Sequence, residues 1–161
     1  MTFRDAYVAA RCAEIQNLLD NAARWSSTDE ELGAHLAAYI SVLLLGVIED
    51  CTEHLIAQRV ARTKDAHVHH YVCLVLDQRF RNPDHGAISG LLKEFGDDYQ
   101  TLFKDKFPHT GKEAEALQAI VDNKNSLAHV GTRKLEMTLA DVADYCGRIV
   151  PILEGLEQIL A

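Results

Sequence analysis

The sequence predicts an all-α protein, a single-domain helical bundle of about five to seven helices with two long helices at its centre. Three observations favour this class. Apolar residues recur at helical spacing along most of the 161 residues, no segment shows the alternation of a β-strand, and Pro and Gly separate the helical segments. The length suits one domain with its own core, so residues 1–161 are expected to form one unit.

The first two helices are expected at Thr2 to about Asn21 and at Asp29 to about Arg62. The second should open with a capping box, because Thr28 is followed by Glu31 three residues later. Its middle is apolar on all sides, which is typical of a buried central helix. The stretch AAYISVLLLGVIEDC is too short to span a bilayer and ends in acidic residues, so no membrane association is expected.

Three shorter helices should follow. The first is expected at about Asp65 to Phe80 and ends before RNPDHG, where Pro and Gly break the chain. The segments AISGLLKEFG and DDYQTLFKDKF then predict two short helices that are separated at Gly96.

The last two helices are predicted by apolar spacing and by capping residues. One should run from Lys112 to about Ala128, with apolar residues along one side, and is followed by a loop. The other should start at Thr138, which together with Asp141 forms a capping box. Pro151 should kink this helix or break it locally.

Composition limits the possible partners. The net charge is −8, so the surface as a whole repels phosphate backbones, and any contact with nucleic acid must lie in a local cationic cleft. The densest basic patch, RVARTK (Arg59 to Lys64), is interpreted as a solvated helix end. Four cysteines without a CxxC pair predict reduced core thiols, and the acidic start predicts no signal peptide. A cytoplasmic protein is expected.

The stretch DNKNSLAHVG carries the strongest functional signal. On a helical projection Lys124 falls in the middle of the apolar stripe, while Asn125 and His129 are neighbours at its border. A charge centred on an apolar face must snorkel to solvent, pair, or point into a cleft. The alternative is purely structural, with a snorkelling lysine and a histidine that caps the helix C-terminus.

These residues also resemble a known family. KNSLAH resembles the signature of the HEPN domain superfamily, in which an arginine and a polar residue precede a histidine. AYISVLLLGVIEDCTEHLI, RNPDHGAISGLLKEFGDDY and TLADVADYCGRIVPILEGLEQIL are similar to further segments of its RiboL-PSP and MAE-type group. The match covers roughly Ala37 to Leu160, and it departs from the pattern where Lys124 replaces the arginine.

The resemblance implies a homodimeric, metal-independent endoribonuclease of a toxin or antiphage defence system, without a cofactor. It implies His129 as general acid or base, Lys124 as the group that holds the scissile phosphate, and Asn125 as an orienting residue. Glu49 matches the acidic residue of the second helix and is expected to pair with Lys124 or to orient His129. RNA is then the substrate, and an antitoxin or a nucleotidyltransferase is a possible partner. The alternative is a non-catalytic HEPN module for dimerisation or partner binding.

A metal site is a third possibility. HVHHYVC places His67, His69, His70 and Cys73 together, and Cys73 lies one helical turn from two of these histidines. His54 or His85 would have to complete the ligand set from elsewhere. The competing interpretation is a helix with exposed histidines and a core cysteine.

Overall fold

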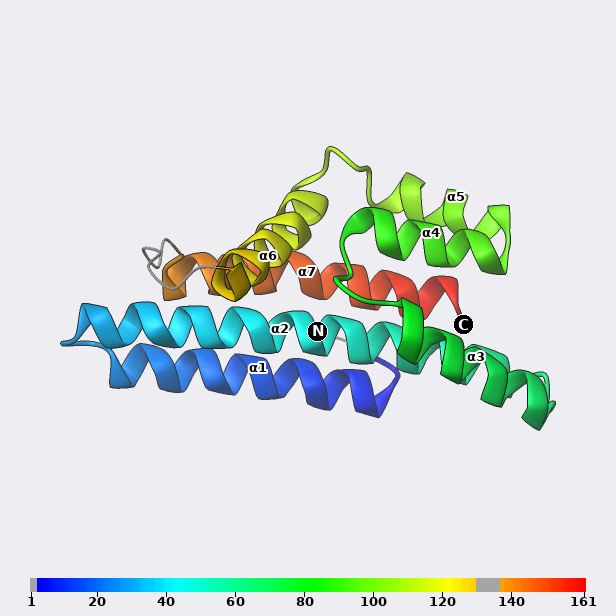
Figure 1. The fold of residues 1–161 in the computed structure, drawn as a ribbon, viewed down its shortest axis with the longest axis horizontal. Coiled ribbons are helices and arrows are strands. Elements are labelled where there is room, and N and C mark those ends of the chain that lie inside the picture. Colours follow the sequence, from blue (N-terminus) through cyan, green and yellow to red (C-terminus); the bar gives the residue numbers. More distant parts are fainter. Residues whose placement is uncertain (1–2, 130–136) are drawn as a thin grey trace.

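The computed structural model describes residues 3–129 and 137–161, except for the side chains of residues 128 and 129. Within these residues the protein is entirely α-helical and contains seven helices, which confirms the predicted class (Figure 1). The helices are α1 (Ala6–Trp25), α2 (Glu30–Ala61), α3 (Ala66–Arg79), α4 (His85–Phe95), α5 (Asp97–Lys106), α6 (Lys112–His129) and α7 (Leu139–Ile159).

Helix α2 is the centre of the bundle. It is 32 residues long and packs against α1, α3, α6 and α7 (Figure 1). Its buried residues cover one broad side, among them Ile40, Ile48, Cys51 and Ile56, which are at most 1% exposed. The helix is central, as expected, but it is not buried all round: Val42, which was expected to complete its apolar middle, is 41% exposed.

The argument from length against a membrane span was wrong. The observed α2 is much longer than its apolar core, and by length and composition it is the one helix of the described residues that could cross a membrane. Of its most apolar window, 39% is buried inside the bundle. A core helix of a globular domain and a membrane-spanning helix share these properties, so composition alone does not separate them.

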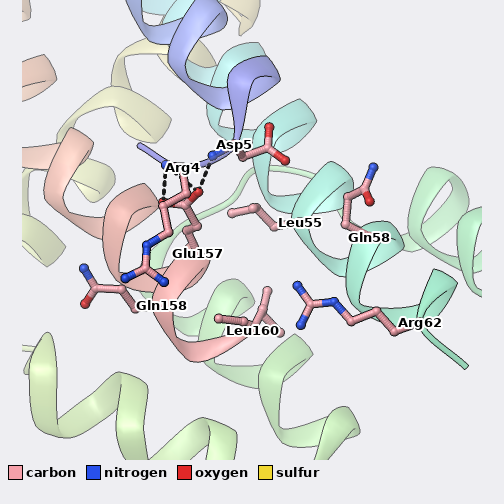
Figure 2. A pocket seen from close by; sticks show the side chains of 9 residues that line it. Arg4, Asp5, Leu55, Gln58, Arg62, Glu157, Gln158 and Leu160 are labelled. Atoms are coloured by element: carbon pink, nitrogen blue, oxygen red, sulfur yellow. Dashed lines mark hydrogen bonds between the residues drawn. The ribbon is translucent and has the colours of Figure 1, made fainter. Parts of the chain in front are cut away.

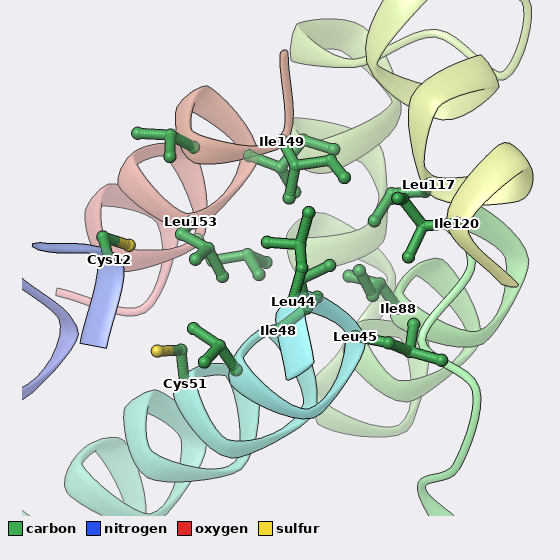
Figure 3. Packing of buried hydrophobic residues seen from close by; sticks show 14 of the residues in the cluster. Cys12, Leu44, Leu45, Ile48, Cys51, Ile88, Leu117, Ile120, Ile149 and Leu153 are labelled. Atoms are coloured by element: carbon green, nitrogen blue, oxygen red, sulfur yellow. The ribbon is translucent and has the colours of Figure 1, made fainter. Parts of the chain in front are cut away.

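The core forms where α2, α6 and α7 meet. Leu44 and Ile48 of α2 pack with Leu117 and Ile120 of α6 and with Leu153 of α7 (Figure 3). All five side chains are at most 3% exposed. Burial of one such side chain stabilises a fold by about 1.5–3 kcal/mol, so this contact fixes the position of α6 on α2.

The capping residues were predicted in one case and missed in another. The Thr138 hydroxyl and the Asp141 carboxylate form the expected capping box of α7, and hydrogen bonds from the Thr138 hydroxyl and N–H lower the pKa of Asp141. The predicted cap at Thr28 was wrong. Helix α2 starts at Glu30, so Asp29 is the N-cap, and its carboxylate accepts the N–H of Leu32 at 2.9 Å.

Other boundaries shift by a few residues. Asp5 caps α1 through the N–H groups of Tyr7 and Val8, so α1 begins at Ala6 and not at Thr2, which is outside the described residues. Helix α7 runs through Pro151 without interruption, so the local break was wrong. Three of the cysteines are buried and free, as expected, and burial raises the pKa of Cys51 to about 12.

Two glycines of α7 should respond oppositely to alanine. A Cβ at Gly155 would lie 2.3 Å from Cε2 of the buried Phe107 ring, whereas a Cβ at Gly147 meets nothing within 4 Å. Chemical denaturation should show that Gly155→Ala lowers the free energy of unfolding by about 1–3 kcal/mol. Gly147→Ala should raise it by about 0.4–1 kcal/mol, because alanine restricts the unfolded chain. Equal effects of the two substitutions would contradict the packing of α5 and its C-cap on α7.

Candidate functional site

Helix α6 carries the motif residues and packs against α2. Its apolar residues Leu117, Ile120 and Val121 are buried against α2 and α7. One turn further on, Lys124 and Asn125 are half-buried. The apolar stripe therefore carries the lysine to the edge of the core, where its amine must find polar surroundings.

The Lys124 amine donates a hydrogen bond to the side chain of Asn82. The distance from Nζ to Oδ1 is 2.7 Å. Asn82 is a neutral amide, and no ion pair joins Lys124 to a carboxylate within the described ranges. A half-buried ammonium group is thus oriented by this chain, but its charge is not cancelled there.

The segment between α3 and α4 places this acceptor. Phe80 ends α3 and is 5% exposed, so its side chain anchors the segment to the core. Asn82 then has a φ of +52°, a left-handed conformation that Asn adopts more readily than most residues. Pro83 follows and fixes the exit of the turn. The turn carries the Asn82 amide toward α6.

Glu49 pairs with Arg81 and not with Lys124. A hydrogen-bonded ion pair joins Arg81 Nη1 to Glu49 Oε1, and the same guanidinium lies near Glu53 and Asp77. The hydrogen bond with Glu49 raises the pKa of Arg81. The expected partnership of Glu49 with Lys124 is therefore not formed among the described residues, because the neighbouring Arg81 occupies the carboxylate.

Glu53 is the less well paired carboxylate beside Arg81. Its Oε1 is buried without a hydrogen bond, and it lies 3.8 Å from Arg81 Nη1. Burial raises the pKa of Glu53, the charge of Glu49 raises it further, and Arg81 opposes both. Because the folded-state pKa is raised, the contribution of Glu53 to stability is full below the ordinary pKa of a glutamate and is lost as the pH rises through the folded-state pKa.

The other polar residues of the motif differ in their contacts. Asn123, which the sequence reasoning passed over, donates from Nδ2 to Oγ of the buried Ser41 at 2.6 Å and ties α6 to α2. The Asn125 side chain is half-buried and has no hydrogen-bond partner within the described residues. The backbone of His129 is the last residue of α6, one turn after Asn125, and its side chain is outside the described part.

The candidate metal ligands do not converge. His69 and Cys73 do approach, with 3.8 Å between Nε2 and Sγ, while His67 and His70 are exposed. No three His, Cys, Asp or Glu side chains gather to hold an ion in the part of the chain that the structure describes.

The two histidines that could have joined such a ligand set have other partners. His54 Nε2 lies 3.0 Å from Asp5 Oδ2. His85 is buried and its Nε2 lies 2.7 Å from the carbonyl oxygen of Phe107. Both histidines therefore serve contacts within the bundle that a metal ion would have to displace.

Sequence reasoning missed Arg81 and Asn82. RNPDHG was interpreted as a break and as part of a segment similar to HEPN domains, but Arg81 and Asn82 were given no partner or role. The available signal was Asn before Pro, a pair that favours a turn in which the amide side chain is held outside a helix. The partner of that amide depends on how α6 crosses α2, which the local sequence does not encode.

Comparisons of the chain with protein-family models, with curated proteins and with solved structures found no match. The similarity to HEPN domains therefore depends on the residues of this chain alone. The evidence for function in the structure is the geometry at Lys124.

Proposed function

We propose that the chain is a metal-independent endoribonuclease of the HEPN type, which acts as a homodimer in a toxin or antiphage defence system. The observation that supports this most is the half-buried Lys124 amine, oriented by the neutral Asn82 amide at 2.7 Å. An oriented cation that no carboxylate of the described residues neutralises is suited to a phosphate group. In such a system an antitoxin or a nucleotidyltransferase is the expected partner.

The proposed reaction uses side chains only. His129 removes the proton from the RNA 2′-hydroxyl, whose oxygen attacks the adjacent phosphorus, and the bond to the 5′-oxygen of the next nucleotide breaks as that oxygen takes a proton from the protonated His129. The products are a 2′,3′-cyclic phosphate and a 5′-hydroxyl. Lys124 holds the scissile phosphate and offsets the charge that develops on it, and Asn125 orients His129 or the phosphate.

The acidic neighbours of the site are compatible with a bound phosphate. Glu49 was expected to lie in the site, but the ion pair with Arg81 offsets its charge. Burial raises the pKa of Glu53, and Arg81 opposes this shift. Arg81 therefore partly offsets both carboxylates of this cluster.

A non-catalytic HEPN module is the second candidate. It is favoured by the fact that Lys124 and Glu49 both have partners within the chain, as a purely structural pair of contacts would. Lysine also lacks the planar, bidentate fork of arginine, so its contact with phosphate is less directional. Substitutions at Lys124 separate the two candidates.

Loss of either motif residue should abolish RNA cleavage. Removal of a proton-transfer group lowers a rate about 10²- to 10⁴-fold. The RNA cleavage rates of the His129→Ala and Lys124→Ala proteins should both fall by that order in assays with EDTA present. Lys124→Arg should keep or raise the rate, because arginine provides the bidentate contact. The assay follows a labelled RNA and identifies the cyclic phosphate end.

Lys112→Ala is the matched control, since Lys112 is an exposed lysine at the start of the same helix. It should cleave like the original protein. A His129→Ala protein that cleaves several RNAs at the original rate would refute catalysis. If the original protein is inert and Lys124→Arg switches it on, the non-catalytic module is correct.

The proposal also requires a dimer. Two copies related by twofold symmetry would bring two Lys124 motifs into one cleft, with a contact that buries more than about 1,000 Å². Light scattering at high protein concentration should report twice the mass of one chain. A monomer at every concentration would remove the composite site and with it this form of the mechanism.

A further inference from the structure

A polar cavity lies at the C-terminal end of α2. The segment before α1, the last turns of α2 and the end of α7 enclose a cavity of about 520 Å³. Leu55 and Leu160, which are at most 5% exposed, form its apolar floor. This volume lies within the range of small-molecule sites, about 300–1,000 Å³.

Two arginines face this cavity without partners. Figure 2 shows the guanidinium groups of Arg4 and Arg62 on either side of Leu160. Neither side chain forms a hydrogen bond or an ion pair with another residue of the described ranges. A guanidinium group presents planar N–H donors that match the oxygens of phosphate.

The two carboxylates of the wall already have donors of their own. Glu157 accepts the N–H groups of Arg4 at 2.9 Å and Asp5 at 2.5 Å (Figure 2). Asp5 accepts the N–H groups of Tyr7 and Val8 and contacts His54. Burial raises the pKa of Asp5, but these contacts outweigh it and hold the pKa below its ordinary value. The carboxylates are thus committed to the end of the bundle, and the arginines remain available.

Further donors and cations lie around the rim. Gln58 and Gln158 line the cavity, and the Lys106 amine donates to Oε1 of Gln158. Arg59 is held nearby by the hydroxyl of Tyr99 at 2.8 Å. Arg4, Arg59, Arg62 and Lys106 therefore lie at this end beside the carboxylates of Asp5 and Glu157, so this end is less acidic than the net charge of −8 suggests, which favours an anion.

We propose that this cavity binds a small phosphate-bearing molecule, with Arg4 and Arg62 on its phosphate oxygens and Leu55 and Leu160 under its apolar part. The site is independent of the proposed RNA cleavage. Arg62, the C-cap of α2, lies thirteen positions after Glu49, a rise of about 20 Å along the helix. The part of RVARTK that contains Arg62 is then a binding element and not only a solvated helix end.

Calorimetric titration with pyrophosphate at low ionic strength tests the proposal. We expect saturable binding of one pyrophosphate per chain, weakened by added salt. Arg4→Gln and Arg62→Gln should each weaken binding at least tenfold, because each removes a charge-assisted contact. Neither side chain forms a hydrogen bond or an ion pair within the described residues, so circular dichroism should show both variants folded. Arg79→Gln, an exposed arginine of α3 away from the cavity, is the matched control and should bind like the original protein.

Four results would overturn the proposal. The first three are the absence of saturable binding, unchanged binding by the Arg4→Gln and Arg62→Gln variants, and citrate binding as tight as pyrophosphate, which would assign the site to carboxylates. A short RNA that displaces pyrophosphate with higher affinity would assign the surface to RNA and not to a small molecule. Pyrophosphate binding that persists in Lys124→Ala would show that the two sites are separate, whichever result the cleavage assay gives.

Discussion

The broad buried side of α2 is the constraint on which the rest of the structure depends. That side has to be covered by other helices, and α1, α3, α6 and α7 pack against α2. The crossing of α6 over α2 follows from Leu117 and Ile120 against Leu44 and Ile48, and this crossing sets where Lys124 leaves the core.

The polar side chains of both proposed sites lie where the covering of α2 is incomplete. Between α2 and α6 the segment after α3 fills the gap, with Arg81 turned to Glu49 and Asn82 turned to Lys124. The outcome is an ion pair beside an ammonium group that has only a neutral partner. The same principle acts at the far end of α2, where Arg4 and Arg62 border a cavity that no side chain fills.

Much of the fold could be predicted because it depends on local periodicity and caps. The boundaries of α3, α6 and α7 follow from apolar spacing and from signals such as Thr138 with Asp141. The position of Lys124 on the apolar side of α6 could be predicted for the same reason. Its partner could not, since the contact with Asn82 joins residues 42 positions apart and depends on the crossing of two helices. The pairing of Glu49 failed likewise, because Arg81 is brought to it by the turn after α3.

The central claim is that Lys124 keeps an unneutralised charge for a phosphate, and Asn82→Asp tests it most directly. Aspartate accepts the left-handed φ of +52° that this position requires, so the turn should persist, while the new carboxylate pairs with the lysine amine. The account predicts at least a tenfold loss of RNA cleavage. Asn82→Gly removes the acceptor, leaves the charge and should keep most of the activity. An Asn82→Asp protein that cleaves RNA as fast as the original would contradict the claim.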